Sequence, residues 1–164
     1  MPFNKLKIYN ERLEVDSMTE SQRNESLRGI FKRDFIDSTN FYNNKLITPT
    51  PKDGQTTMDV LFAHLTTKTE NKDTNSRCYD RDRSVRLHWI RHHFLCYQRY
   101  NIEIFSVKDK AGIRTYFHDI KESYVIILEP KSSDLYYLIT AYYIKGGDCK
   151  KIENKKKRKL PEVY

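Results

Sequence analysis

One segment, residues 80–100, concentrates side chains that could bind a negatively charged group and exchange protons with it. It reads DRDRSVRLHWIRHHFLCYQRY and holds five arginines, three histidines and the only tryptophan of the chain. A helix over residues 80–97 would place one hydroxyl, one imidazole and two guanidiniums in a single stripe. That stripe consists of Arg81, Ser84, His88 and Arg91. Such a set could hold a phosphate and move a proton.

Two other interpretations of this helix stay open. A charged stripe opposite an apolar face, here Val85 and Trp89, is typical of the solvated side of an amphipathic helix. His88, His92 and Cys96 also follow one another at a spacing of four residues, which could form the edge of a metal site. No carboxylate lies in register with them and no CxxC or HExxH motif accompanies them, so we predict no metal.

Further candidate groups lie outside this segment. His64 stands at the polar edge of a short helix in FAHLTT. In the strand LITAYYI, alternation places Thr140 and Tyr142 on one face and Tyr143 on the other. The chain lacks a serine-protease triad, a P-loop, a dinucleotide-binding glycine motif and a paired-carboxylate cluster.

With these motifs absent, the candidate functional side chains are those of His, Arg, Lys, Glu, Thr and Tyr. Side chains of these types can cleave RNA without a metal or another cofactor. The ribose 2′-hydroxyl is the nucleophile, so the protein needs only a base, an acid and cations for the developing phosphate charge. DNA lacks this hydroxyl, and such a site would therefore act on RNA.

The elements that would position these groups predict an α+β fold, with helices first and then an antiparallel sheet of about four strands. Short connections favour antiparallel neighbours. We divide the chain into an N-terminal helical or irregular segment (1–55), an α+β core (56–149) and a basic C-terminal tail (150–164). The predicted helices cover 19–35, capped by Thr19, then 56–66 and 80–97, and 68–76 is a polar loop. The predicted strands cover 101–107, 113–120, 123–129 and 135–144.

Together with this order of elements, the motifs FAHLT, RLHWI and YYLITAY resemble the barnase–EndoU–colicin–RelE group of small nucleases, particularly its phage- and toxin-associated members. The resemblance covers about residues 56–145. It implies a toxin-like or phage-conflict ribonuclease that works without a metal. By position it implies site residues on two helices and on the last strand, which are His64, Arg86 or Arg91 with His88, and Thr140.

In this interpretation His88 is the general base or acid, with His64 as the alternative. Arg86 and Arg91 would hold the phosphate, while Thr140 would orient it or hold a water molecule. Arg81 would contribute to RNA binding. The alternative function is a module that binds nucleic acid or a protein without catalysis, in which the histidines would be scattered or buried.

The basic tail is a second candidate for binding RNA. Residues 150–164 hold seven Lys or Arg against two Glu, so they contribute +5 of the net charge of +8. Lys155, Lys156, Lys157 and Arg158 could follow a phosphate backbone. The tail could equally keep the protein soluble or bind an acidic antitoxin or immunity protein.

Composition also bounds the environment in which the protein works. No stretch reaches the roughly 18 apolar residues of a membrane helix, and the N-terminus lacks the apolar core of a secretory signal. Cys78, Cys96 and Cys149 form no close pair. We therefore expect a protein of the reducing cytoplasm that does not bind a membrane.

Overall fold

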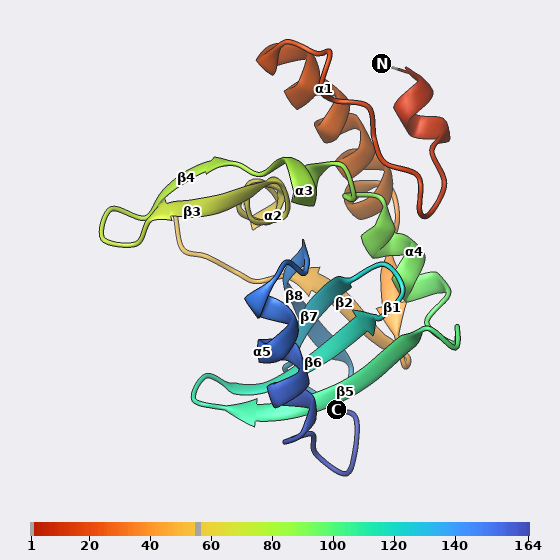
Figure 1. The fold of residues 1–164 in the computed structure, drawn as a ribbon, viewed down its shortest axis with the longest axis vertical. Coiled ribbons are helices and arrows are strands. Elements are labelled where there is room, and N and C mark those ends of the chain that lie inside the picture. Colours follow the sequence, from red (N-terminus) through yellow and green to blue (C-terminus); the bar gives the residue numbers. More distant parts are fainter. Residues whose placement is uncertain (1, 55–56) are drawn as a thin grey trace.

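A six-stranded sheet forms the centre of the protein, with helices on both of its faces (Figure 1). The computed structural model describes residues 2–54 and 57–164. The strand order is β1-β2-β8-β7-β6-β5. The strands of this sheet are β1 (Asn40–Tyr42), β2 (Lys45–Pro49), β5 (Ile102–Asp109), β6 (Gly112–Asp119), β7 (Tyr124–Pro130) and β8 (Leu135–Tyr143).

The α+β class and the four antiparallel strands β5 to β8 are confirmed, but the predicted number of about four strands is wrong. The hairpin β1–β2 adds two strands, and β2 runs parallel to β8, so the sheet is mixed. These strands escape sequence analysis because they are short and their burial does not alternate clearly along β2. Their place in the sheet depends on β8, which lies far away in the sequence.

The helices are not all N-terminal, which corrects a second expectation. They are α1 (Glu20–Phe31), α2 (Thr57–Thr66), α3 (Arg81–Ser84), α4 (Trp89–Leu95) and α5 (Gly147–Lys156), with a 3-10 turn at Pro2–Leu6 and a π-helical turn at Lys32–Ile36. Thr19 caps α1 as predicted. Its hydroxyl accepts from the Gln22 amide, and the Gln22 side chain accepts from the Thr19 amide.

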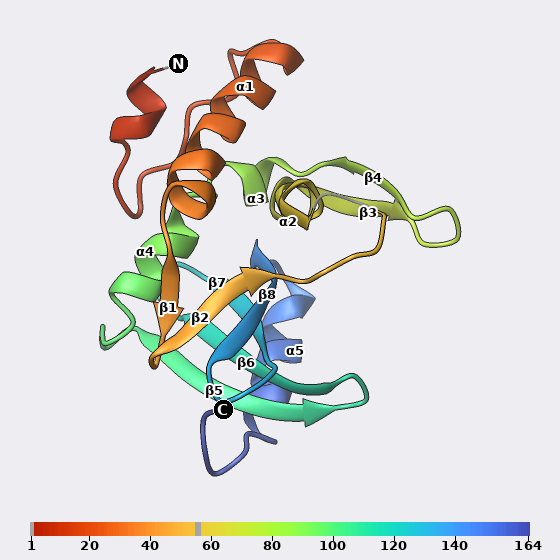
Figure 2. The same ribbon diagram turned by 180° about the vertical axis from the view of Figure 1, so that it is seen from behind.

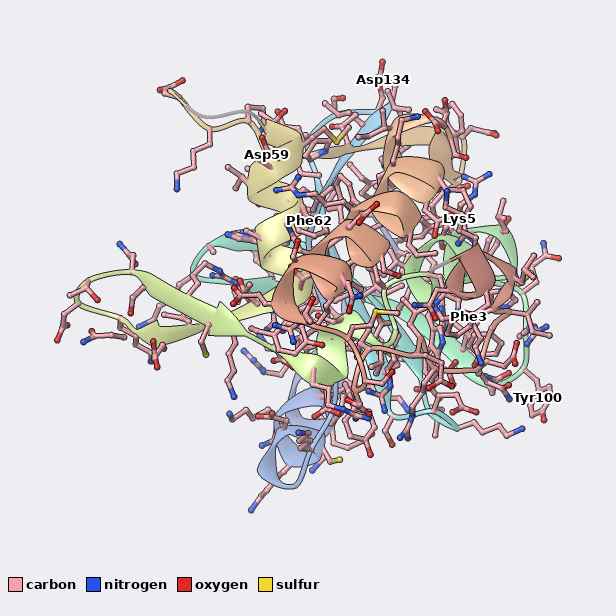
Figure 3. All side chains as sticks on the ribbon, turned by 90° about the horizontal axis from the view of Figure 1, so that it is seen from above. Phe3, Lys5, Asp59, Phe62, Tyr100 and Asp134 are labelled. Carbon is pink, nitrogen blue, oxygen red and sulfur yellow. The ribbon has the colours of Figure 1, made fainter. Side chains whose placement is uncertain are left out.

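The polar segment expected as a loop is instead a hairpin that projects from the body (Figures 1 and 3). Strand β3 (Thr67–Asn71) pairs with β4 (Ser76–Tyr79). Asn75 adopts a positive φ of 53° at the turn, a conformation that Asn tolerates better than most residues. The hairpin begins directly where α2 ends, so it extends the surface of that helix.

The predicted helix over residues 80–97 is broken between α3 and α4 by a turn at 85–88. Every residue from 84 to 90 is buried, including Val85, Leu87 and Trp89. A continuous helix would direct some of these side chains to solvent, because they do not share one face. The turn allows all of them to enter the core.

Two apolar cores lie on opposite faces of the sheet. The larger joins α1, α2 and α4 to one face and includes Leu27, Leu65 and Phe94, while the smaller lies under α5 around Ile152. Figure 2 shows the N-terminal helix continuing into β1 and β2. The boundary predicted between residues 55 and 56 lies outside the described residues. The segment before it shares the larger core with the later elements.

Residues 150–164 are not a free tail. Most of α5 lies in this segment, and the chain after it returns to the sheet, where the Leu160 amide donates to the Ser106 carbonyl at 2.7 Å. Thr115 donates to the Tyr164 carbonyl at 2.7 Å. Within the described residues, none of the helices is both long and apolar enough to span a bilayer.

Candidate active site

The N-terminal segment covers the stripe that was expected to face phosphate. Arg81 forms a bidentate ion pair with Asp16, at 2.6 and 2.5 Å. His88 is 5% exposed, and its Nε2 lies 3.1 Å from the Ile8 carbonyl. Ser84 is fully buried and donates to the Thr66 carbonyl. Ser84 and His88 therefore lie inside the protein, whereas Arg81 is exposed and paired with Asp16, and His88 has no route to a substrate in this arrangement.

Arg91 and Arg86 also serve the fold. Arg91 donates to the Asn40 side-chain oxygen at 2.9 Å, which ties α4 to β1. Arg86 is 2% exposed and lies over the Tyr143 ring, with the guanidinium carbon 4.1 Å from the ring centroid. It donates to the Asp82 carbonyl at 2.8 Å. These two guanidiniums are occupied by protein groups instead of facing a common cleft.

A different arginine brings the remaining candidates together. One terminal nitrogen of Arg83, Nη1, donates to the His64 carbonyl at 2.7 Å and to the Thr140 hydroxyl at 3.2 Å. Its Nε lies 3.5 Å from Asp80, which caps α3 by accepting from the Arg83 amide. Arg83 thereby joins α2, α3 and β8 at one point. The backbone carbonyl of His64 and the hydroxyl of Thr140, two of the predicted residues, meet there.

The strand register explains why Thr140 reaches this point. Ile127 of β7 pairs with Thr140, whereas Leu128 pairs with Leu138, so Ile139 is an extra residue on β8. Such a bulge re-aims the side chains that follow it. Thr140 and Tyr142 share the face that carries α5, and the predicted alternation of these two residues is confirmed.

His64 is half-buried and surrounded by cations. Burial lowers the pKa of its ring below the usual 6.5, and the charges of Arg77, Lys52 and Arg83 lower it further. The Ile139 carbonyl opposes this effect. No carboxylate is among these influences, so the ring is a neutral imidazole at physiological pH, able to accept a proton.

Tyr142 provides a group of the opposite character. Burial, together with the charges of Tyr116 and Asp148, raises its pKa to about 12, while Arg83 acts in the other direction. The hydroxyl therefore keeps its proton at neutral pH. Tyr142 and Arg83 line a cavity of about 220 Å³ together with Lys68, Asp80, Asp82, Tyr143, Lys145 and Asp148.

Arg83 was not among the predicted site residues because one continuous helix was expected over residues 80–97. The available signal was the DRDRS motif, in which Asp80 is a favourable N-cap and Arg83 falls in the first turn after it. A short helix starting at residue 81 directs Arg83 towards β8. Arg77 lies between the predicted loop (68–76) and the predicted helix (80–97), where no element was predicted, so its place on a strand beside α2 was not expected.

The cations of the C-terminal segment divide into two kinds. Lys155 pairs with Asp109 at 3.3 Å and Lys156 pairs with Glu103, so both hold α5 against β5. Lys157 and Arg158 are exposed, and within the described part of the chain no carboxylate lies at ion-pair distance from them. Of the four cations predicted to bind RNA, this second pair is therefore the one free to meet a phosphate backbone. Among the described residues, Lys150 and Lys159 are likewise exposed and without an ion pair.

A second polar cluster lies between the N-terminal segment and the sheet, and its groups hydrogen-bond to one another. Asp119 accepts from Tyr9, from Asn101 at 2.9 Å and from His93 at 2.8 Å. The other His93 nitrogen lies 2.6 Å from the Trp89 carbonyl, so both ring nitrogens face protein oxygens. Burial would raise the pKa of Asp119, but the hydrogen bonds from His93 and Tyr9 lower it further than burial raises it. This is a structural ion pair.

Acid is expected to destabilise the protein through its histidines. Burial lowers the pKa of His88, and burial with neighbouring His93 lowers that of His92 to about 4. Both histidines bind protons more weakly in the folded protein than in the unfolded chain. Their contribution to the free energy of unfolding is therefore complete above about pH 6.5 and decreases as the pH falls towards their pKa values in the folded protein. Urea midpoints measured between about pH 7 and about pH 5 should therefore decrease. A variant His92→Gln should show a shallower decrease, and equal slopes would contradict this assignment.

No group of three or more His, Cys, Asp or Glu side chains suited to hold a metal ion occurs in residues 2–54 and 57–164. All three cysteines are free thiols. In comparisons with protein-family models, curated proteins and solved structures, nothing matched this chain.

Proposed function

We propose that the protein is an RNA endonuclease that needs no metal and that uses the ribose 2′-hydroxyl as its nucleophile. The observation that supports this best is the pair of hydrogen bonds by which Arg83 joins His64 and Thr140. They hold the Arg83 guanidinium between the backbone of α2 at His64 and the Thr140 hydroxyl of β8, and the charge of Arg83 acts on the neutral His64 ring. The residue resemblance to small toxin- and phage-associated nucleases agrees with two of these three residues.

In the proposed reaction His64 is the general base. Its neutral ring takes the proton of the 2′-hydroxyl as that oxygen attacks the phosphorus. The nearby positive charges that lower the His64 pKa are the same charges that would attract the phosphate. Once the dianionic transition state forms, its negative charge stabilises the protonated imidazole.

Tyr142 is the proposed general acid. The P–O5′ bond breaks as the P–O2′ bond forms, and the leaving 5′-oxygen takes the Tyr142 proton. Its pKa of about 12 is suited to an alkoxide leaving group, which is far more basic. Arg83 would hold a non-bridging phosphate oxygen, and Thr140 would orient it. The products are a 2′,3′-cyclic phosphate and a 5′-hydroxyl end.

A second function has two observations in its favour. His88, the other imidazole expected at the site, lies buried under the N-terminal segment, and three aspartates line the cavity beside Arg83. A module that binds RNA or a protein partner, such as an acidic antitoxin, needs no acid–base pair. It would use the same cations without cleavage.

The proposal is tested with purified protein and RNA in excess EDTA. We expect cleavage to persist, and replacement of Arg83 by Ala to reduce kcat by about 10²-fold, as expected for loss of a transition-state charge contact. Arg99→Ala is the matched control, since Arg99 lies over the Tyr9 ring outside the site. Intact RNA with the parent protein would refute the nuclease. Equal losses in both variants would refute the role of Arg83.

A further inference from the structure

A second cationic surface lies between α1, α2 and the β3–β4 hairpin. A groove of about 770 Å³ is lined there by residues of all these elements. Figure 3 shows α1 lying beside α2, with Phe62 on α2 and the hairpin extending from the same end of the body. Nearly half of the lining residues belong to α1, so the N-terminal segment builds a surface that the later elements could not form alone.

Two arginines of α1 lie against aromatic rings in this groove. The guanidinium carbon of Arg23 is 4.0 Å from the Tyr79 ring centroid, and that of Arg28 is 4.5 Å from the Phe62 centroid. Stacking on a ring fixes each planar guanidinium while leaving its N–H edges and its outer face available. Such an arrangement can contact both a phosphate and the face of a base.

The charges of the groove are only partly compensated. Arg28 pairs with Asp59 at 3.0 Å. Arg23 and Arg77 have no carboxylate at ion-pair distance among residues 2–54 and 57–164. Glu20 is the other acidic residue of the lining. The groove therefore offers two uncompensated guanidiniums to an anionic partner.

Arg77 connects the groove to the candidate active site. It donates to the Thr67 hydroxyl at 2.7 Å and to the Thr67 carbonyl at 2.9 Å, directly after the end of α2. From there its charge acts on the His64 ring and on Arg83. A strand that occupies the groove would thus reach His64 by passing over Arg77.

We propose that this groove binds single-stranded RNA and holds the nucleotides that flank the cleavage point at His64. The link to cleavage rests on the proposed function, whereas binding in the groove does not. Single strands are favoured because their unstacked bases can lie on guanidinium planes, which a duplex does not permit. In this view α1 extends the substrate site and accounts for the N-terminal segment.

The test measures binding of a single-stranded 2′-O-methyl oligoribonucleotide, which cannot be cleaved because its nucleophile is blocked. Arg23→Ala should weaken binding by about tenfold, and the slope of log K against log salt should fall by about 0.7, the value for one phosphate contact on a single strand. Arg23→Lys should recover the slope but only part of the affinity, because Lys keeps the charge without the planar stack. Thermal unfolding confirms that each variant is folded.

The control is Lys110→Ala, which removes one positive charge from the exposed turn between β5 and β6. Unchanged affinity for Arg23→Ala, or an equal loss for Lys110→Ala, would overturn the groove proposal. If Arg23-dependent binding is found but the parent never cleaves unmodified RNA, the groove stands and the nuclease fails. If cleavage occurs but Arg23→Ala binds normally, the nuclease stands and the groove fails.

Discussion

Replacing His64 by Ala is expected to reduce RNA cleavage in EDTA by at least about 10²-fold, the usual contribution of a general acid–base group. The ring is half-buried at the edge of α2, so its removal should change the fold little. The loss should appear in kcat, because His64 acts on the proton of the 2′-hydroxyl and does not carry the phosphate. Single-turnover rates with a defined oligoribonucleotide measure this directly.

His92→Gln is the matched control for this experiment. His92 also has a lowered pKa, but it stacks on Tyr9 with ring centroids 4.2 Å apart, away from Arg83 and Thr140. We expect it to retain the parent rate. A loss of less than about threefold in His64→Ala would remove His64 from the chemistry. An equal loss of rate in His92→Gln would indicate that both variants disturb folding.

The largest expected effect on stability belongs to Asp119→Asn, with a loss of about 3–5 kcal/mol in the free energy of unfolding. Removing one partner of a buried ion pair leaves the other charge uncompensated. Here the remaining partner is the His93 ring, which is fully buried and would lose its carboxylate. Tyr9 and Asn101 would also lose a charged acceptor. Urea unfolding followed by tryptophan fluorescence reports this well, because Trp89 lies beside the cluster.

Asp134→Asn provides the control for this measurement. Asp134 is exposed in the turn between β7 and β8 and accepts from Ser132 at 2.6 Å. Its replacement should change stability by less than about 0.5 kcal/mol, as is usual at exposed positions. A loss below about 1 kcal/mol in Asp119→Asn would mean that the ion pair contributes little more than an ordinary hydrogen bond.

The segment before α2 has two structural roles. Residues near Tyr9, Asp16 and Asn40 lie against α3 and α4. Tyr9 donates to the buried Asp119, Asn40 accepts from Arg91, and Asp16 pairs with the exposed Arg81. Helix α1 forms one wall of the arginine groove. Removal of this segment is therefore a poor test of either proposed function, because it exposes the core and removes the groove together.

Local sequence determined much of this protein. The apolar strands β7 and β8 and the alternation that directs Thr140 and Tyr142 to one face follow from patterns a few residues long. The same holds for the Thr19 cap and for the core face of α2. Such features depend on backbone geometry and on neighbours in the sequence, so they can be derived without the fold.

Tertiary structure decided which polar groups face a cleft. The helix expected over residues 80–97 breaks because its consecutive residues are all covered, on one side by the sheet and on the other by the N-terminal segment. This coverage buries His88 and turns Arg83 towards His64. Helical periodicity shows which residues share a face but not what packs against that face. The contacts that cover this segment come from residues as many as 80 positions away in the sequence. Which residues of segment 80–97 remain exposed is therefore decided by how the segment packs in the tertiary structure.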